Sequence, residues 1–118
     1  IKVIGVTPPL ASELYQAMAS SYYALLLRSF QEKIPPLFAH HGFAYFDFLD
    51  ITKLGIKDVY MLDGVHPTET GAAKMLDTIL DETCQTGIIE NCQKIHKNLV
   101  NSLNRPKTTP AEMDFDTF

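Results

Sequence analysis

The sequence has few basic residues and no cluster of them. It contains 10 Lys and Arg residues against 14 Asp and Glu residues, which gives a formal net charge of −4 at pH 7. Proteins that bind nucleic acids use clustered Lys and Arg to neutralise phosphate groups. We therefore expect no nucleic acid among the partners of this chain.

Long apolar runs are also missing. The longest, Tyr22 to Leu27, is far shorter than the roughly 20 apolar residues that a membrane-spanning helix needs. No basic segment followed by an apolar run begins the sequence, so no signal peptide is visible. We expect no transmembrane segment in this chain, and its cellular location stays unknown at this point.

Cysteine is scarce, and no metal-binding spacing accompanies it. Cys84 and Cys92 can pair only if the chain between them turns back, and we favour two unpaired, half-buried thiols. No C-x-x-C or H-x-x-x-H spacing is present, so we expect no metal site. A glycine-rich phosphate loop is missing too, because Pro8 and Pro9 follow the first apolar run and lack the necessary backbone amides. The sequence implies no cofactor.

The pattern of apolar residues predicts an α/β protein. Two short apolar runs, residues 1–7 and 43–48, are typical of buried strands. Between them, helical spacing extends from residue 10 to 32, and Pro35 and Pro36 are expected to interrupt the helix before a last turn to His41. Strand, helix and strand form a βαβ unit, whose right-handed crossover makes the strands parallel. A loop at 49–62 and helices at 68–83 and 88–103 are expected to follow.

Two parallel strands alone do not make a stable sheet. Both predicted strands are apolar on both faces, as strands in the middle of a parallel sheet are. A sheet of only two such strands has open edges and too little cover. We therefore expect further strands from a segment before Ile1, from a second chain or from a symmetric partner. Residues 1–104 are predicted to belong to one α/β domain, and residues 105–118 to form a flexible acidic tail.

One short run carries the strongest chemical signal. In Asp63-Gly64-Val65-His66-Pro67-Thr68, a carboxylate precedes an imidazole by three positions, directly before a predicted helix. Acyl transfer on a serine needs a base near neutral pKa, usually histidine, and a carboxylate that holds its tautomer. Asp63 and His66 could fill these roles. A turn at Asp-Gly and a histidine that covers a helix end are the structural alternative.

The segment Tyr60 to Gly71 resembles the last conserved block of the SGNH, or GDSL-type, hydrolases, which contains D-x-x-H before a helix. The preceding order of strand, long helix and strand also matches. The resemblance covers residues 1–80 and implies a three-layer α/β/α, flavodoxin-like parallel sheet whose N-terminal strands are missing here. It thereby implies that residues 1–104 are the C-terminal portion of such a domain. It implies that Asp63 orients His66, the base of a Ser-His-Asp triad. The implied activity is that of a serine esterase, acyl hydrolase or acyltransferase on an ester-bearing lipid, acetylated sugar or cell-envelope substrate.

The nucleophile of this family has no counterpart in the chain. No Gly-Asp-Ser occurs, and the serines lie in helix-like segments: Ser12, Ser20, Ser21, Ser29 and Ser102. The family's oxyanion-hole Gly and Asn blocks also precede the matched region. We expect a chain that is inactive without a complementing N-terminal half. The alternative is a non-catalytic protein-interaction or dimerisation module that uses its apolar helix and sheet edges, with a homo-oligomer as one form.

Other polar and aromatic groups receive structural interpretations. We expect His40 and His41 to be exposed at a helix C-terminus, and Asp47 and Asp50 to cap loops after the second strand. Ser12 is expected to cap the first helix. Four aromatic residues at core-like spacing are expected to pack in the core: Tyr15, Tyr22, Tyr23 and Phe30.

Overall fold

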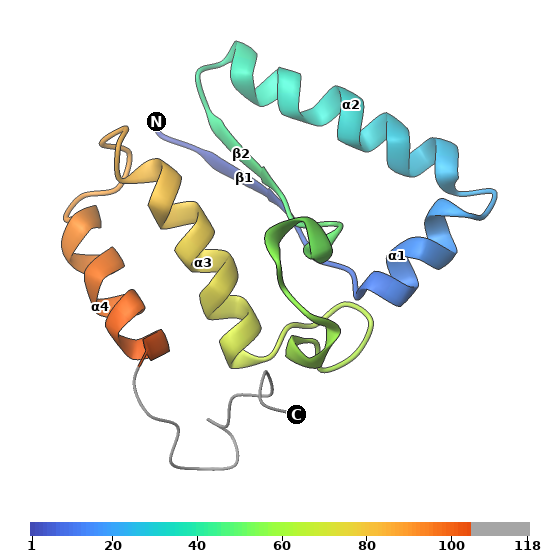
Figure 1. Ribbon diagram of the computed structural model, residues 1–118. Coiled ribbons are helices and arrows are strands. Elements are labelled where there is room, and N and C mark those ends of the chain that lie inside the picture. Colours follow the sequence, from blue (N-terminus) through green and yellow to red (C-terminus); the bar gives the residue numbers. More distant parts are fainter. Residues whose placement is uncertain (105–118) are drawn as a thin grey trace. The chain divides into compact units, whose positions relative to one another are not determined.

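The computed structural model describes residues 1–104, so the predicted acidic tail at 105–118 lies outside the described residues. Figure 1 shows the elements along the chain. They are β1 (Ile4–Thr7), α1 (Ser12–Ala19), α2 (Ala24–His40), β2 (Ala44–Asp47), the 3₁₀ helices η1 (Ile51–Leu54) and η2 (Asp58–Tyr60), α3 (Glu69–Thr83) and α4 (Cys92–Asn104). The chain divides into two compact units, one from Ile1 to His66 and one that begins at Pro67.

The first unit contains a parallel pair of strands. β1 and β2 run side by side with Ile4 opposite Ala44 and Thr7 opposite Asp47. This confirms the predicted parallel βαβ arrangement, although both strands are shorter than the apolar runs suggested. A glycine is required at position 5, because a Cβ there would lie 2.3 Å from a ring carbon of Phe38 on α2. The absent side chain lets the helix lie close to the strand.

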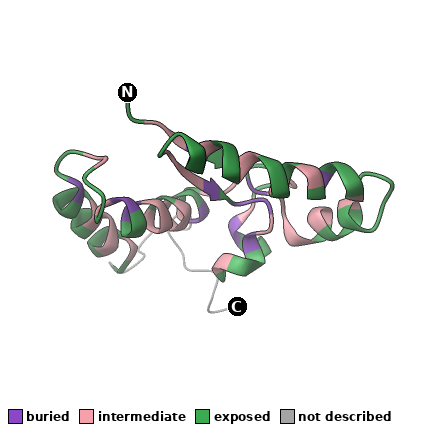
Figure 2. Cartoon of the chain, turned by 90° about the horizontal axis from the view of Figure 1, so that it is seen from above, coloured by how far each residue is buried: buried purple, intermediate pink, exposed green. Residues whose placement is uncertain are grey.

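Within residues 1–104, the sheet has only these two strands. Val6, in the middle of β1, remains 43% exposed. The core of the first unit instead gathers at the end of β2 and in the segment after it, drawn in purple in Figure 2. Its buried residues are Leu27, Phe46, Phe48, Leu49, Ile51, Ile56 and Tyr60. The fold class is thus mixed α/β with a parallel sheet, and the three-layer arrangement stays a prediction.

The predicted single helix over residues 10–32 is wrong. The chain forms two helices, and the break lies at residues 20–23 rather than at the prolines. Ser21 makes the turn: its hydroxyl donates to the carbonyl of Met18 at 2.7 Å and accepts from the amide of Tyr23 at 3.1 Å. Such local serine bonds compete with a continuous helix. α2 continues through Pro35 and Pro36, which each remove one helical donor without ending it.

The helix break also overturns the predicted aromatic core. Tyr22 is 88% exposed, Tyr23 51% and Phe30 54%, whereas Tyr15 is half-buried. The prediction assumed one continuous helical phase, and the turn at Ser21 starts a new one. In α2 the buried residue is Leu27.

In the second unit, α3 begins where the sequence predicted. Thr68 is the N-cap of α3, and its hydroxyl accepts from the amide of Gly71 at 3.0 Å. On α3, Leu80 is buried, whereas Ala72 and Leu76 are exposed. Thr83 is buried as well, and its hydroxyl donates to the carbonyl of Ile79 at 2.7 Å. This bond satisfies a polar group that the hydrophobic pattern could not predict as buried.

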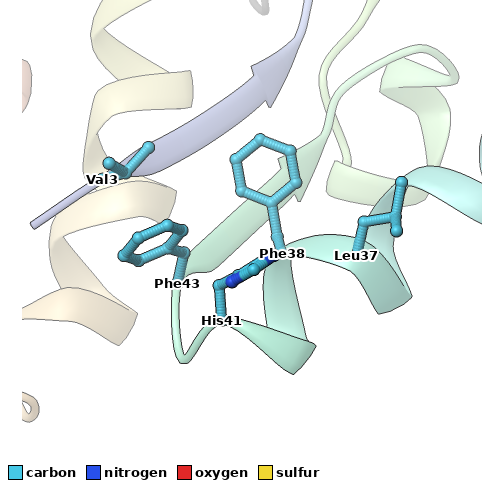
Figure 3. A pocket seen from close by; sticks show the side chains of 5 residues that line it. All are labelled: Val3, Leu37, Phe38, His41 and Phe43. Atoms are coloured by element: carbon cyan, nitrogen blue, oxygen red, sulfur yellow. The ribbon is translucent and has the colours of Figure 1, made fainter.

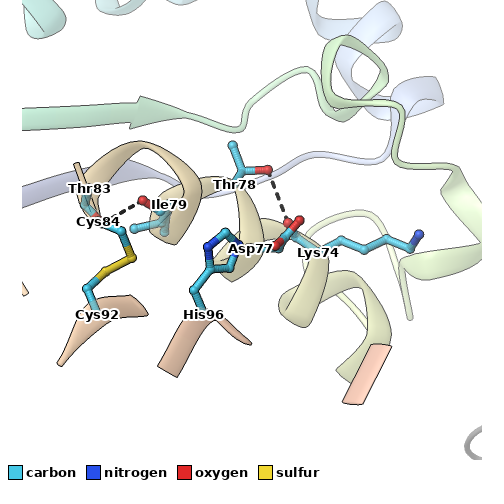
Figure 4. Close-up of polar contacts among 8 residues, drawn as sticks. All are labelled: Lys74, Asp77, Thr78, Ile79, Thr83, Cys84, Cys92 and His96. Carbon is cyan, nitrogen blue, oxygen red and sulfur yellow. Dashed lines mark hydrogen bonds and ion pairs between the residues drawn. A yellow bond between two sulfur atoms is a disulfide. The ribbon is translucent and has the colours of Figure 1, made fainter. Parts of the chain in front are cut away.

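The prediction that Cys84 and Cys92 are unpaired thiols is also wrong. Cys84 at the end of α3 and Cys92 at the start of α4 form a disulfide (Figure 4). The chain reverses between them through Gly87 and Asn91, which have positive φ angles of 71° and 56°. This reversal delays α4 to Cys92, four positions after the predicted start at residue 88. α3 and α4 are further joined by His96, whose Nε2 lies 2.7 Å from Oδ1 of Asp77.

Candidate active site

The segment from Leu62 to His66 forms a tight loop that is held together by the side chain of Asp63. Oδ1 of Asp63 accepts hydrogen bonds from the backbone amides of Val65 and His66, both at 2.8 Å. The amide of Leu62 donates to the carbonyl of His66 at 2.7 Å and closes the loop. Aspartate favours such turns because its short carboxylate reaches amides two and three residues ahead. The turn at Asp63-Gly64 and the pair of Asp63 and His66 are therefore formed by the same loop and the same carboxylate.

Asp63 and His66 are joined by their side chains. Nδ1 of His66 lies 2.8 Å from Oδ2 of Asp63, so this carboxylate uses one oxygen for the backbone and the other for the imidazole. In neutral histidine this bond favours the tautomer with the hydrogen on Nδ1, which leaves Nε2 as an acceptor. Nε2 of His66 has no hydrogen-bond partner among the described residues. The side chain is 70% exposed, so Nε2 is accessible to an incoming hydroxyl group.

The carboxylate of Asp63 is strongly favoured in its charged form. The amide of Val65, then the side chain and the amide of His66, lower the pKa of Asp63 to about 2. Hydrogen bonds to a carboxylate stabilise its ionised form in this way. Asp63 is therefore negatively charged throughout the pH range in which a histidine base works, as an orienting carboxylate must be.

α1 contacts this loop through its first residues. The amide of Ala11 donates to the carbonyl of Gly64 at 2.9 Å. Asp58, the first residue of η2, accepts from the amide of Ser12 at 2.7 Å and from its hydroxyl at 2.6 Å. These bonds, the hydroxyl of Ser12 first, lower the pKa of Asp58. The role predicted for Ser12 is wrong: it is the first residue of α1, and Asp58 satisfies the helix terminus instead.

Asp58 was missed by sequence reasoning. It lies 46 positions from Ser12, and no spacing rule joins residues so far apart. None of the serines of the first unit, Ser12, Ser20, Ser21 and Ser29, hydrogen-bonds to His66. Ser12 is already bound to Asp58, and Ser21 belongs to the turn between the helices.

An open cleft of about 470 Å³ lies beside Asp63. α1 and the segment from Asp58 to Gly64 form its walls, which are partly apolar through Leu14 and Met61 and partly acidic through Glu13. The cleft places solvent-accessible space next to the carboxylate of the Asp-His pair.

A second hollow of about 240 Å³ lies elsewhere in the first unit, with almost entirely apolar walls. Figure 3 shows its side chains, which are Val3, Leu37, Phe38, His41 and Phe43. His41 caps the C-terminus of α2 and its ring stacks on Phe43 with centroids 6.0 Å apart. The predicted helix-end location of His40 and His41 is confirmed. Within residues 1–104, no three His, Cys, Asp or Glu residues are grouped so that they could hold a metal ion.

Asp47, the last residue of β2, and Asp50, which follows β2, have the predicted capping roles. Oδ1 of Asp47 accepts from the amide of Leu49 at 3.0 Å. Oδ1 of Asp50 accepts from the amide and hydroxyl of Thr52 and caps η1. Both side chains are thus used in local turns.

The helices of the described part are all too short or too polar to cross a membrane. Comparison of the chain with protein-family models, with curated proteins and with solved structures found no match.

Proposed function

We propose that this chain supplies the Asp-His pair of a Ser-His-Asp triad in a serine esterase, acyl hydrolase or acyltransferase of the SGNH type. The hydrogen bond of 2.8 Å between Oδ2 of Asp63 and Nδ1 of His66 is the observation that carries the proposal. It gives each residue a separate role, because Asp63 orients the imidazole and His66 accepts a proton. The three-layer sheet and the serine belong to the same proposal and come from a complementing N-terminal half.

The proposed chemistry uses both ring nitrogens of His66: Nδ1 faces Asp63, and Nε2 transfers the proton. Nε2 of His66 takes the proton of the serine hydroxyl as its oxygen attacks the ester carbonyl, and the C–O bond to the leaving alcohol then breaks. The protonated imidazole returns its proton to that alcohol, which leaves an acyl-serine. Water hydrolyses the acyl-serine in a hydrolase, and a second alcohol accepts the acyl group in an acyltransferase. The charge of Asp63 stabilises the imidazolium in both steps.

Reading the coding sequence upstream of Ile1 is the first test. We expect a strand followed by Gly-Asp-Ser and a helix in a continuous reading frame. The longer polypeptide should hydrolyse p-nitrophenyl acetate, and His66→Ala should lower kcat about a thousandfold or more. His40→Ala is the matched control, since this exposed histidine ends α2 and should leave the rate unchanged.

The 118-residue chain alone provides the complementary test. It should not hydrolyse the ester above the buffer rate, because it lacks the nucleophile. Turnover by this chain that disappears in His66→Ala would contradict the assignment of the serine to another segment. Equal rates for the longer wild type and its His66→Ala variant would overturn the triad.

The alternative is a non-catalytic interaction module. The exposed apolar side chains around α2 favour it: Tyr22, Tyr23, Leu25, Leu26, Phe30 and Leu37. So large an apolar surface is typical of a protein interface. If the alternative is correct, Leu26→Glu should abolish self-association in sedimentation experiments, while His66→Ala should leave both association and turnover unaffected.

A further inference from the structure

The junction between β1 and α1 has three consecutive amides with three separate partners. The amide of Leu10 donates to the carbonyl of Leu49 at 3.2 Å. The amide of Ala11 donates to the carbonyl of Gly64 at 2.9 Å, and the amide of Ser12 to Oδ1 of Asp58 at 2.7 Å. Amides at a helix N-terminus have no partner inside the helix, so they are available to other segments.

These bonds join the sheet to the loop of the Asp-His pair. The bond from Leu10 continues the parallel pairing past the ends of both strands, where Leu10 lies opposite Asp50. The bonds from Ala11 and Ser12 then hold Gly64 and Asp58, at two points of the segment that precedes His66. The junction therefore links the carboxyl end of the sheet to the loop through hydrogen bonds.

Leu14 lies close to the same glycine. A Cβ at position 64 would lie 2.9 Å from Cδ2 of Leu14, closer than side chains pack. The loop therefore lies close to the first turn of α1, and the backbone hydrogen bond from Ala11 joins the two. Only hydrogen fits at position 64 while Leu14 stays in place.

We propose that Ala11 is a positioning residue for the Asp63–His66 pair: its amide, bonded to the carbonyl of Gly64, holds the loop in the geometry that joins the two side chains. The catalytic consequence rests on the proposed function, whereas the positioning itself does not. The side chain of Ala11 takes no part, so the residue acts through its backbone alone.

Ala11→Pro tests this role. Ala11 has a φ angle of −55°, which proline adopts without strain, so the substitution removes the amide hydrogen and leaves the backbone angle acceptable. Ala11→Ser is the matched control because it keeps the amide. Both variants are made in the 118-residue chain and studied by NMR at the ring nitrogens of His66 and at the carboxylate of Asp63.

In wild type and in Ala11→Ser, neutral His66 should carry its hydrogen on Nδ1 and Asp63 should have a pKa of about 2. In Ala11→Pro, the ring should show a mixture of tautomers and the pKa of Asp63 should rise toward its ordinary value near 4. The amide of Phe48, which donates to the carbonyl of Thr7, reports whether the sheet stays folded.

An unchanged tautomer and an unchanged Asp63 titration in Ala11→Pro would overturn the proposal, because the loop's own bonds would then suffice. If Phe48 loses its exchange protection in that variant, the wild-type chain replaces it as the test. The amide of Ala11, bonded to the carbonyl of Gly64, should then be protected from hydrogen exchange. Rapid exchange of this amide while Asp63 keeps its pKa of about 2 would contradict the role. These readouts need no turnover, so failure of the proposed hydrolase activity is seen separately in the ester assay.

Discussion

Ser12 and Asp58 form two hydrogen bonds across 46 positions of sequence. The carboxylate accepts from the amide of Ser12 at 2.7 Å and from its hydroxyl at 2.6 Å. Asp58 thus satisfies the N-terminus of α1 from η2, as the side chain of an N-cap residue otherwise does. The same contact fixes the segment that leads into the Asp63–His66 loop.

Asp58→Ala should therefore destabilise the chain by about 1 kcal/mol, the usual cost of losing a helix cap. Urea unfolding followed by circular dichroism measures this cost. Asp81→Ala is the control, because Asp81 is an exposed carboxylate on α3, and it should change stability by less than about 0.5 kcal/mol. Equal midpoints for both variants would mean that the bonds to Ser12 contribute no stability.

Asp63 should titrate with a midpoint of about 2, followed through the amide shifts of Val65 and His66. Its pKa is lower in the folded chain than the value near 4 in an unfolded chain. Its contribution to stability is therefore present above pH ~4 and is lost as the pH falls toward 2. Asp63→Asn should remove the transition in these shifts. A wild-type midpoint near 4 would contradict the hydrogen-bonded loop.

The core of the first unit can be tested with two adjacent leucines. Leu27 is 8% exposed, whereas Leu26 is 55% exposed. Leu27→Ala should cost about 2–5 kcal/mol because it leaves a cavity, and Leu26→Ala should cost far less. Urea unfolding of the two variants compares them directly. A larger loss for Leu26→Ala would mean that the outer face of α2 is covered in solution.

The disulfide between Cys84 and Cys92 should be detected by mass spectrometry. Iodoacetamide should label neither cysteine in the unreduced, denatured chain and should label both after reduction. The closed loop is short, and such a disulfide stabilises its unit by about 2–3 kcal/mol in the chain-entropy model. The double variant Cys84→Ser with Cys92→Ser should accordingly melt α3 and α4 at lower temperature. Labelling of both cysteines without reductant would show that the thiols are free.

Features that depend on near neighbours in sequence were predictable. Thr68 caps α3 through an amide three positions ahead, and Asp63 binds amides two and three positions ahead. The D-x-x-H spacing also predicted which two side chains could meet, and they do meet. Such contacts require only local backbone angles, which residue type and spacing largely determine.

Features that depend on the path of the chain through space were decided by tertiary structure. The bond of Ser12 to Asp58 and the disulfide form only because distant or reversed segments arrive at the same place. The exposure of Phe30 follows from a turn at Ser21 that changes which face of the helix packs inward. The sequence alone thus determined the parallel βαβ order and the Asp-His loop, since their interactions are short-range or repeat regularly along the chain. Burial, and the bonds of Asp58 to the start of α1, were decided by packing, because they depend on which segment lies opposite.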